Sequence, residues 1–107
     1  MRTVTAPELA DWLQDPSRPS PVILDVREHW EIEIASLPDS EHVPMGRLPS
    51  SLDRLQPERT TVCLCHHGAR SLQVAIYLER QGFTDVINLT GGIHAWAVQV
   101  DPSIAVY

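Results

Sequence analysis

A cysteine, two histidines, a glycine and an arginine occur within six residues, in the segment Cys65-His66-His67-Gly68-Ala69-Arg70-Ser71. A thiolate is a strong nucleophile, and the free N–H groups and dipole at a helix N-terminus favour that charged form. An apolar strand pattern ends just before Cys65, and a helical pattern begins just after it. We therefore predict that Cys65 is a catalytic nucleophile at a strand-to-helix junction.

The residues after Cys65 are predicted to form a substrate-binding loop, comprising His66, His67, Gly68, Ala69, Arg70 and Ser71. The N–H groups of such a turn have no helical partners, so they converge on an anion held above the sulfur. Gly68 lets the backbone turn without a Cβ clash, and Arg70 offers a planar pair of donors to sulfonate, phosphate or persulfide groups. The two histidines are expected to line the loop, and which of them points inward stays open.

Cys63 lies two residues earlier, inside the predicted strand, and is expected to be a buried structural residue. Together with Cys65, His66 and His67 it resembles a metal cluster. Tetrahedral zinc, however, needs four ligands that converge from separate points. Four donors within five residues, half of them on a strand, do not meet that geometry. We predict neither a metal site nor a cofactor.

Alternating strand and helix patterns place this loop in an α/β fold. Short apolar runs predict buried strands, and an apolar stripe with a glycine at its end predicts a helix. The expected elements are a helix through Leu13 capped by Thr5, strands 22–26, 60–64 and 86–89, and helices 69–81 and 93–100. This order implies a parallel sheet with helices on both faces. Ligands bind at the carboxyl ends of such strands, where Asp25 and Cys65 lie.

Length, charge, apolar stretches and cysteine spacing further limit the classes of protein that the sequence allows. With 107 residues, one domain over residues 1–107 is expected, and the net charge of −6 argues against a nucleic-acid partner. No apolar stretch has the roughly 18 residues of a membrane span, and the N-terminus lacks the apolar core of a signal peptide. Cys63 and Cys65 are too close on a strand for disulfide geometry. We predict a cytoplasmic protein with reduced thiols and no membrane partner.

Four landmarks, in this order and spacing, resemble the rhodanese family over nearly the whole chain. They are Leu24-Asp25-Val26-Arg27-Glu28, the Cys65–Ser71 loop, Gln81-Gly82-Phe83, and Asn88-Leu89-Thr90-Gly91-Gly92-Ile93 with Ala95-Trp96. The resemblance implies a single rhodanese-like domain with a five-stranded parallel sheet flanked by helices on both faces. It also implies a thiosulfate sulfurtransferase-like enzyme that transfers sulfane sulfur to a thiophilic acceptor through a persulfide on Cys65. Asp25 and Arg27 are expected to support the fold and the loop.

Loop length and the C-terminal segment refine this resemblance. Four residues separate Cys65 from Arg70, whereas members resembling dual-specificity phosphatases have one more. Sulfur transfer is therefore preferred over phosphatase or arsenate reductase activity. The segment from Val100 to Tyr107 is similar to rhodanese domains fused behind enzymes that adenylate sulfur carriers. The alternative function is thus a non-turnover persulfide relay or binding module, serving a sulfur-carrier or tRNA-thiolation partner. The expected partners are a small sulfur donor, thiosulfate or a persulfide, and a protein sulfur acceptor.

Overall fold

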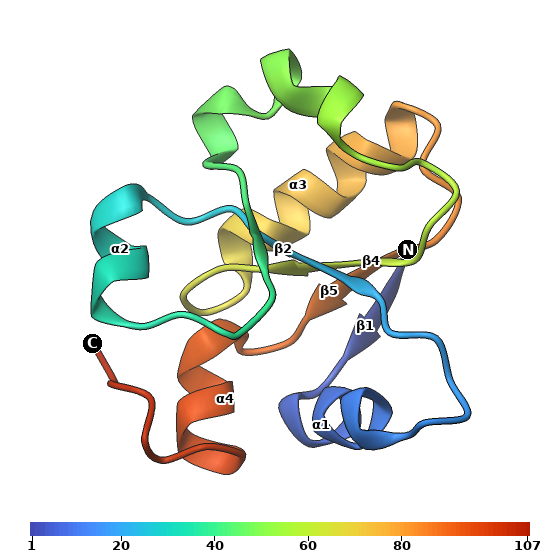
Figure 1. Ribbon diagram of the computed structural model, residues 1–107. Coiled ribbons are helices and arrows are strands. Elements are labelled where there is room, and N and C mark those ends of the chain that lie inside the picture. The colour runs from blue at the N-terminus through green and yellow to red at the C-terminus, as the bar shows by residue number, and fades with distance from the viewer.

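The computed structural model describes residues 1–107 and contains one sheet of five parallel strands with helices on both faces (Figure 1). The strands are β1 (Arg2–Val4), β2 (Val22–Asp25), β3 (Glu41–His42), β4 (Thr61–Leu64) and β5 (Val86–Leu89). Their order across the sheet is β1-β5-β4-β2-β3, which puts β4 at the centre. The predicted α/β architecture with a five-stranded parallel sheet is confirmed.

Four α-helices and two short 3₁₀ segments connect the strands: α1 (Ala6–Gln14), α2 (His29–Ile34), α3 (Ala69–Arg80), α4 (Gly92–Gln99), η1 (Met45–Arg47) and η2 (Pro49–Arg54). Helix α1 begins as expected at a Thr5 cap, where the Glu8 N–H and the Thr5 hydroxyl are 3.3 Å apart. Helix α3 ends before Gly82, whose φ is +95°, and the Phe83 N–H then donates to the Leu78 carbonyl. Both predicted helix boundaries thus follow from capping residues.

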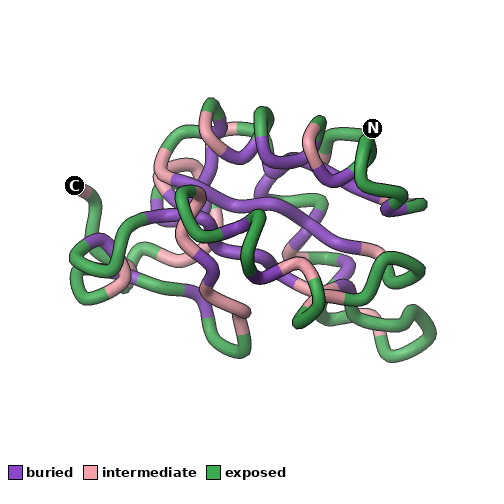
Figure 2. Tube along the Cα trace, turned by 90° about the horizontal axis from the view of Figure 1, so that it is seen from above, coloured by how far each residue is buried: buried purple, intermediate pink, exposed green.

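The central strands are buried on both sides, as Figure 2 shows by the purple trace through the middle of the molecule. Along β4 the side chains alternate between two apolar clusters. Val62 and Leu64 pack with residues of α1 and α4, whereas Cys63 and Cys65 pack with residues of α3. Cys65 therefore continues the strand's alternation and points to the face that α3 covers.

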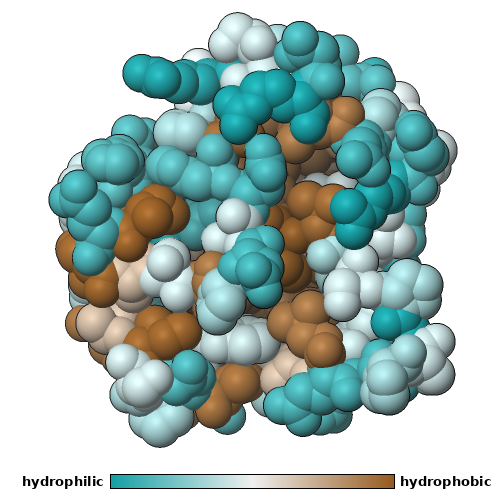
Figure 3. All heavy atoms as spheres, in the orientation of Figure 1, coloured by the Kyte–Doolittle hydropathy of each residue, from teal (hydrophilic) through white to brown (hydrophobic).

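Three elements were not predicted: β1, α2 and β3. They contain three, six and two residues, too few for a periodic apolar pattern. Helix α2 reverses the usual pattern of buried apolar and exposed charged side chains, because its Glu31 is buried while Trp30 and Ile34 are exposed. Figure 3 shows apolar surface on this side of the molecule, around α2 and the C-terminal segment.

The longest helix, α3, has 12 residues. No helix has the length and apolar character needed to traverse a bilayer.

Candidate active site

The loop between β4 and α3 carries Cys65 at the carboxyl edge of the sheet. Gly68 is the N-cap of α3 and has a φ of +110°, a conformation that a side chain disfavours. Its N–H donates to Cys65 Sγ over 3.0 Å. A Cβ at this position would lie 3.3 Å from the Gly91 nitrogen, so a side chain would also press on the neighbouring loop. The turn thus aims a backbone donor at the sulfur.

Ser71 and Asn88 make a second set of contacts around Cys65 and Gly68. The Ser71 hydroxyl lies 3.3 Å from Cys65 Sγ, 3.2 Å from the Gly68 carbonyl and 2.6 Å from Asn88 Oδ1. Because a hydroxyl has one proton, it serves one of these three acceptors at a time, which leaves the Gly68 amide as the fixed donor to sulfur. Asn88 Nδ2 donates to the Gly68 carbonyl. Asn88, on β5, belongs to one of the sequence landmarks, but no role in the site was predicted for it.

The two cysteines differ in environment. Cys63 is fully buried inside β4, and burial raises the pKa of its thiol to about 12, with the nearby Cys65 acting in the same direction. Cys63 is therefore a protonated core residue at neutral pH. Cys65 is 1% exposed, but its sulfur has donors directed at it. Cys65 lines none of the cavities. A substrate molecule therefore reaches the Cys65 sulfur only when neighbouring side chains move.

Arg70 forms an ion pair that was not expected from the sequence. Its two terminal nitrogens donate to the two oxygens of the Glu31 carboxylate, over 2.6 and 2.8 Å. These contacts hold the pKa of Glu31 well below its usual range, at about 2, and the Tyr107 hydroxyl adds to the effect. The pKa of Arg70 is raised, chiefly by the same contact. This pair was not predicted from the sequence, because the carboxylate comes from an unpredicted helix 39 residues earlier.

Asp25 and Arg27 form a buried ion pair at the end of β2, and both side chains are fully buried. All five guanidinium donors of Arg27 are used, on Asp25, the Tyr107 hydroxyl and the carbonyls of Glu31 and Ala35. Burial disfavours this cation, yet the bonds to Asp25 and Tyr107 outweigh it and raise the pKa of Arg27. The pair thus has the bonding that a buried charge requires.

Tyr107 connects this pair to Arg70. Its hydroxyl accepts from Arg27 and donates to Glu31, and its ring stacks on His66 at a centroid distance of 3.8 Å. Burial raises the pKa of Tyr107 and lowers that of His66. A continuous chain of bonds therefore runs from Asp25 to Arg70. The sequence analysis treated Tyr107 only as part of a family-like tail.

His42, on β3, contacts Arg27 and was not predicted as a functional residue. Its Nε2 lies 2.7 Å from the Arg27 carbonyl, and it lines a cavity of about 440 Å³ between α2 and the 3₁₀ segments. Arg47 and Arg54 line the same cavity. Short strands such as β3 give no sequence pattern that would mark this position.

The fold and the loop together define a class of α/β proteins in which a cysteine lies between the central parallel strand and a helix N-terminus. Residues 5–99 match the family model of the rhodanese-like domain. The chain belongs to the rhodanese-like family, as its sequence landmarks predicted.

Several named relatives agree with this assignment. The chain is 38% identical to a sulfurtransferase of Allochromatium vinosum over 78% of each chain. It is 43% identical to the rhodanese-like/PpiC domain-containing protein 12, chloroplastic, of Arabidopsis thaliana, covering 100% of this chain and 38% of that protein. It is 34% identical to the "Probable adenylyltransferase/sulfurtransferase MoeZ" of Mycobacterium tuberculosis, covering 98% of this chain and 27% of that protein. The chain thus spans well under half the length of the last two relatives.

A solved structure supports the same family. The rhodanese-like domain protein from Staphylococcus aureus superposes with a TM-score of 0.82 at 34% identity, covering 90% of this chain and 91% of that one. Two of these sequence relatives are named as a sulfurtransferase and as a probable adenylyltransferase/sulfurtransferase. The relatives include a chloroplastic protein, so a cytoplasmic location stays a prediction.

Proposed function

We propose that the protein, acting as one domain over residues 1–107, is a sulfurtransferase that carries sulfane sulfur as a persulfide on Cys65. The observation that carries this proposal is the Gly68 N–H directed at Cys65 Sγ, 3.0 Å away, where β4 meets α3. A backbone donor and a helix N-terminus favour a sulfur anion at this position. The loop from His66 to Ser71 then forms the donor-binding site.

The proposed reaction has two displacement steps. With thiosulfate, the Cys65 thiolate attacks the outer sulfur, the S–S bond of the donor breaks, and sulfite leaves with the bonding electrons. The terminal sulfur of the Cys65 persulfide is then the anion, and the N–H groups of the loop hold it. A thiophilic acceptor attacks that terminal sulfur and regenerates the thiolate. The first step needs no general base when Cys65 reacts as the thiolate.

Asp25 and Arg27 are assigned a supporting role in this proposal. The Arg27 guanidinium is 0% exposed and fully bonded, so it has no free donor for a substrate. Arg70 is more accessible, with a side chain 36% exposed, but both its terminal nitrogens engage Glu31. The pair uses two of the five N–H donors of Arg70, which leaves three to contact a donor anion.

Mass spectrometry of the intact protein tests the assignment of Cys65. After exposure to thiosulfate or a low-molecular-weight persulfide, the wild type is expected to gain one sulfur atom and Cys65→Ser none. Cys63→Ser is the matched control and should keep the gain, since the Cys63 thiol is buried and protonated. Sulfur uptake by Cys65→Ser equal to that of the wild type would refute the assignment.

A persulfide relay for a protein partner is the second candidate function. It is favoured by the similarity to an adenylyltransferase/sulfurtransferase and by the low exposure of Cys65, which restricts small donors. A relay would accept sulfur once but form thiocyanate from thiosulfate and cyanide slowly. Sulfur transfer from thiosulfate to cyanide as fast as transfer to any protein acceptor would exclude the relay. Consumption of an aryl phosphate instead of thiosulfate would indicate a phosphatase.

A further inference from the structure

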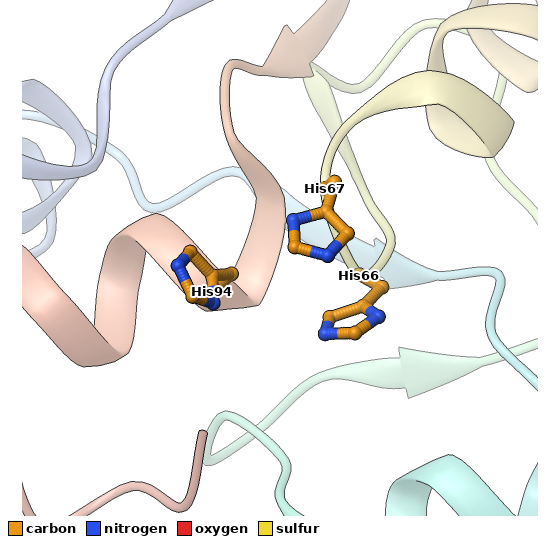
Figure 4. A group of neighbouring side chains, drawn as sticks. All are labelled: His66, His67 and His94. Atoms are coloured by element: carbon orange, nitrogen blue, oxygen red, sulfur yellow. The ribbon is translucent and has the colours of Figure 1, made fainter. Parts of the chain in front are cut away.

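Three histidines from two elements meet beside the Cys65 loop. His66 and His67 belong to that loop, whereas His94 is the third residue of α4 (Figure 4). One ring nitrogen of each lies within 4.8 Å of one from each of the others. The His66 and His67 ring centroids are 3.9 Å apart, and those of His67 and His94 are 5.0 Å apart. The sequence alone does not show this group, because His94 is 27 residues beyond His67.

Backbone hydrogen bonds hold α4 against the loop that carries His66 and His67. The His94 N–H donates to the His66 carbonyl over 3.1 Å, and the Ile93 N–H donates to the Cys65 carbonyl over 2.9 Å. Tyr107 stacks on His66 with an interplanar angle of 2°, which fixes the plane of that ring. The first turn of α4 is therefore attached directly to the loop, which keeps the backbone positions of the three histidines close together.

Two imidazole nitrogens in this group have no partner. His66 Nε2 and His94 Nδ1 are both buried and make no hydrogen bond. A buried nitrogen without a partner is destabilising, and such groups are rare in folded proteins. A metal ion bound between the rings would satisfy both nitrogens at once. His67 is exposed and free to rotate toward the same point.

The geometry points to a binding site for a divalent transition metal ion, such as Zn²⁺, formed by His66, His67 and His94. Zn–N bonds of about 2.0–2.1 Å place tetrahedral ligand nitrogens about 3.3–3.4 Å apart, so the three rings close on an ion by small side-chain rotations from the present spacing of up to 4.8 Å. Imidazole ligands suit Zn²⁺, Cu²⁺ and Ni²⁺ and disfavour Mg²⁺ and Ca²⁺. The three rings fill three positions of a tetrahedron, and the fourth is open to water or to a sulfur anion.

This donor set differs from the one that the sequence analysis rejected. That set combined Cys63 and Cys65 with the two loop histidines, all from one short segment. Cys63 faces α3 from within the apolar core, so it takes no part. His94 supplies the separate point of attachment that the local segment lacks.

Calorimetric titration of the intact protein with Zn²⁺ tests the site. The wild type should bind one Zn²⁺ and show no heat with Mg²⁺. His94→Ala and His67→Ala should each weaken binding at least tenfold, since each removes one of three protein ligands. His29→Ala is the matched control, because His29 lies on α2, exposed and paired with Glu33, and it should bind like the wild type. Cys65→Ser should also retain binding.

The far-UV circular dichroism spectrum of each variant confirms that it is folded, and the absorption of bound Co²⁺ gives an independent readout of tetrahedral coordination. Zn²⁺ binding weaker than about 1 mM in the wild type would overturn the proposal. So would binding that folded His94→Ala and His67→Ala retain in full. Loss of binding in Cys65→Ser together with retention in His94→Ala would place the ion on the cysteines instead.

Discussion

Tyr107 connects two ion pairs by hydrogen bonds: the Asp25–Arg27 pair and the Glu31–Arg70 pair. Its hydroxyl bonds to Arg27 over 2.8 Å and to Glu31 over 2.6 Å. Without it, Arg27 Nη1 would keep only a 3.4 Å contact to the Glu31 carbonyl. The hydroxyl is therefore a structural link between the buried end of β2 and the residue that holds Arg70.

We expect Tyr107→Phe to lower the free energy of unfolding by about 1–2 kcal/mol, because a hydrogen bond to charged partners is lost while the ring keeps its stacking on His66. Chemical denaturation measures this change. Tyr77→Phe is the control, since it deletes a hydroxyl outside this network and should change the stability little. Equal losses in the two variants would contradict the role given to Tyr107.

At the scale of elements, the junction between α4 and the Cys65 loop depends on Gly92. This glycine has a φ of +61°, and a Cβ there would lie 2.4 Å from the Cys65 carbonyl oxygen and 2.5 Å from that of His66. Neither oxygen can move away freely, because both accept hydrogen bonds from the first turn of α4. The close approach of helix and loop thus excludes any side chain.

Gly92→Ala is expected to destabilise the protein by about 2 kcal/mol or more, from backbone strain and from overpacking. It should also reduce sulfur uptake by Cys65, because the loop must shift. Gly46→Ala serves as the control, since Gly46 has an ordinary φ and no atom within 4 Å of the added Cβ. A melting temperature of Gly92→Ala as high as that of Gly46→Ala would show that the junction tolerates a side chain.

The elements that the sequence predicted are those with a local physical signal. Strands β2, β4 and β5 are continuous apolar runs, and α1 and α3 have caps that mark their ends. Helix α2 has no such signal, since it buries Glu31 and exposes Trp30. Its position follows from contacts with Arg70, 39 residues away in the chain. The location of Cys65 was therefore predictable, whereas the partner of Arg70 was not.

At the scale of the whole molecule, charged groups from three distant parts of the chain form one network. Asp25 and Arg27 come from the end of β2, Glu31 from α2, Arg70 from α3, and Tyr107 lies 80 residues after Arg27. Two cations and two carboxylates balance one another, which allows the group to be mostly buried. Folding of α2 and of the C-terminal segment is thus coupled to the active-site loop, and that coupling should appear in the pH dependence of stability.

We predict that Glu31 contributes stability above about pH 4.5 and that this contribution is lost as the pH falls toward 2. The pKa of its carboxyl is lowered from 4.5 to about 2 by Arg70 and Tyr107, so in this range the unfolded chain binds more protons than the folded one. The shift corresponds to about 3 kcal/mol at most, and to less in practice, because the Arg70 side chain is 36% exposed and screened by solvent.

The comparison of wild type with Glu31→Gln isolates this effect from that of the other carboxyls. Denaturation at a series of pH values should show the wild type more stable at pH 7, with the difference in free energy of unfolding shrinking between about pH 4.5 and 2. The difference should also fall with added salt, since Arg70 is partly exposed. A difference that stays constant down to pH 2 would mean that the Glu31–Arg70 pair does not stabilise the folded protein.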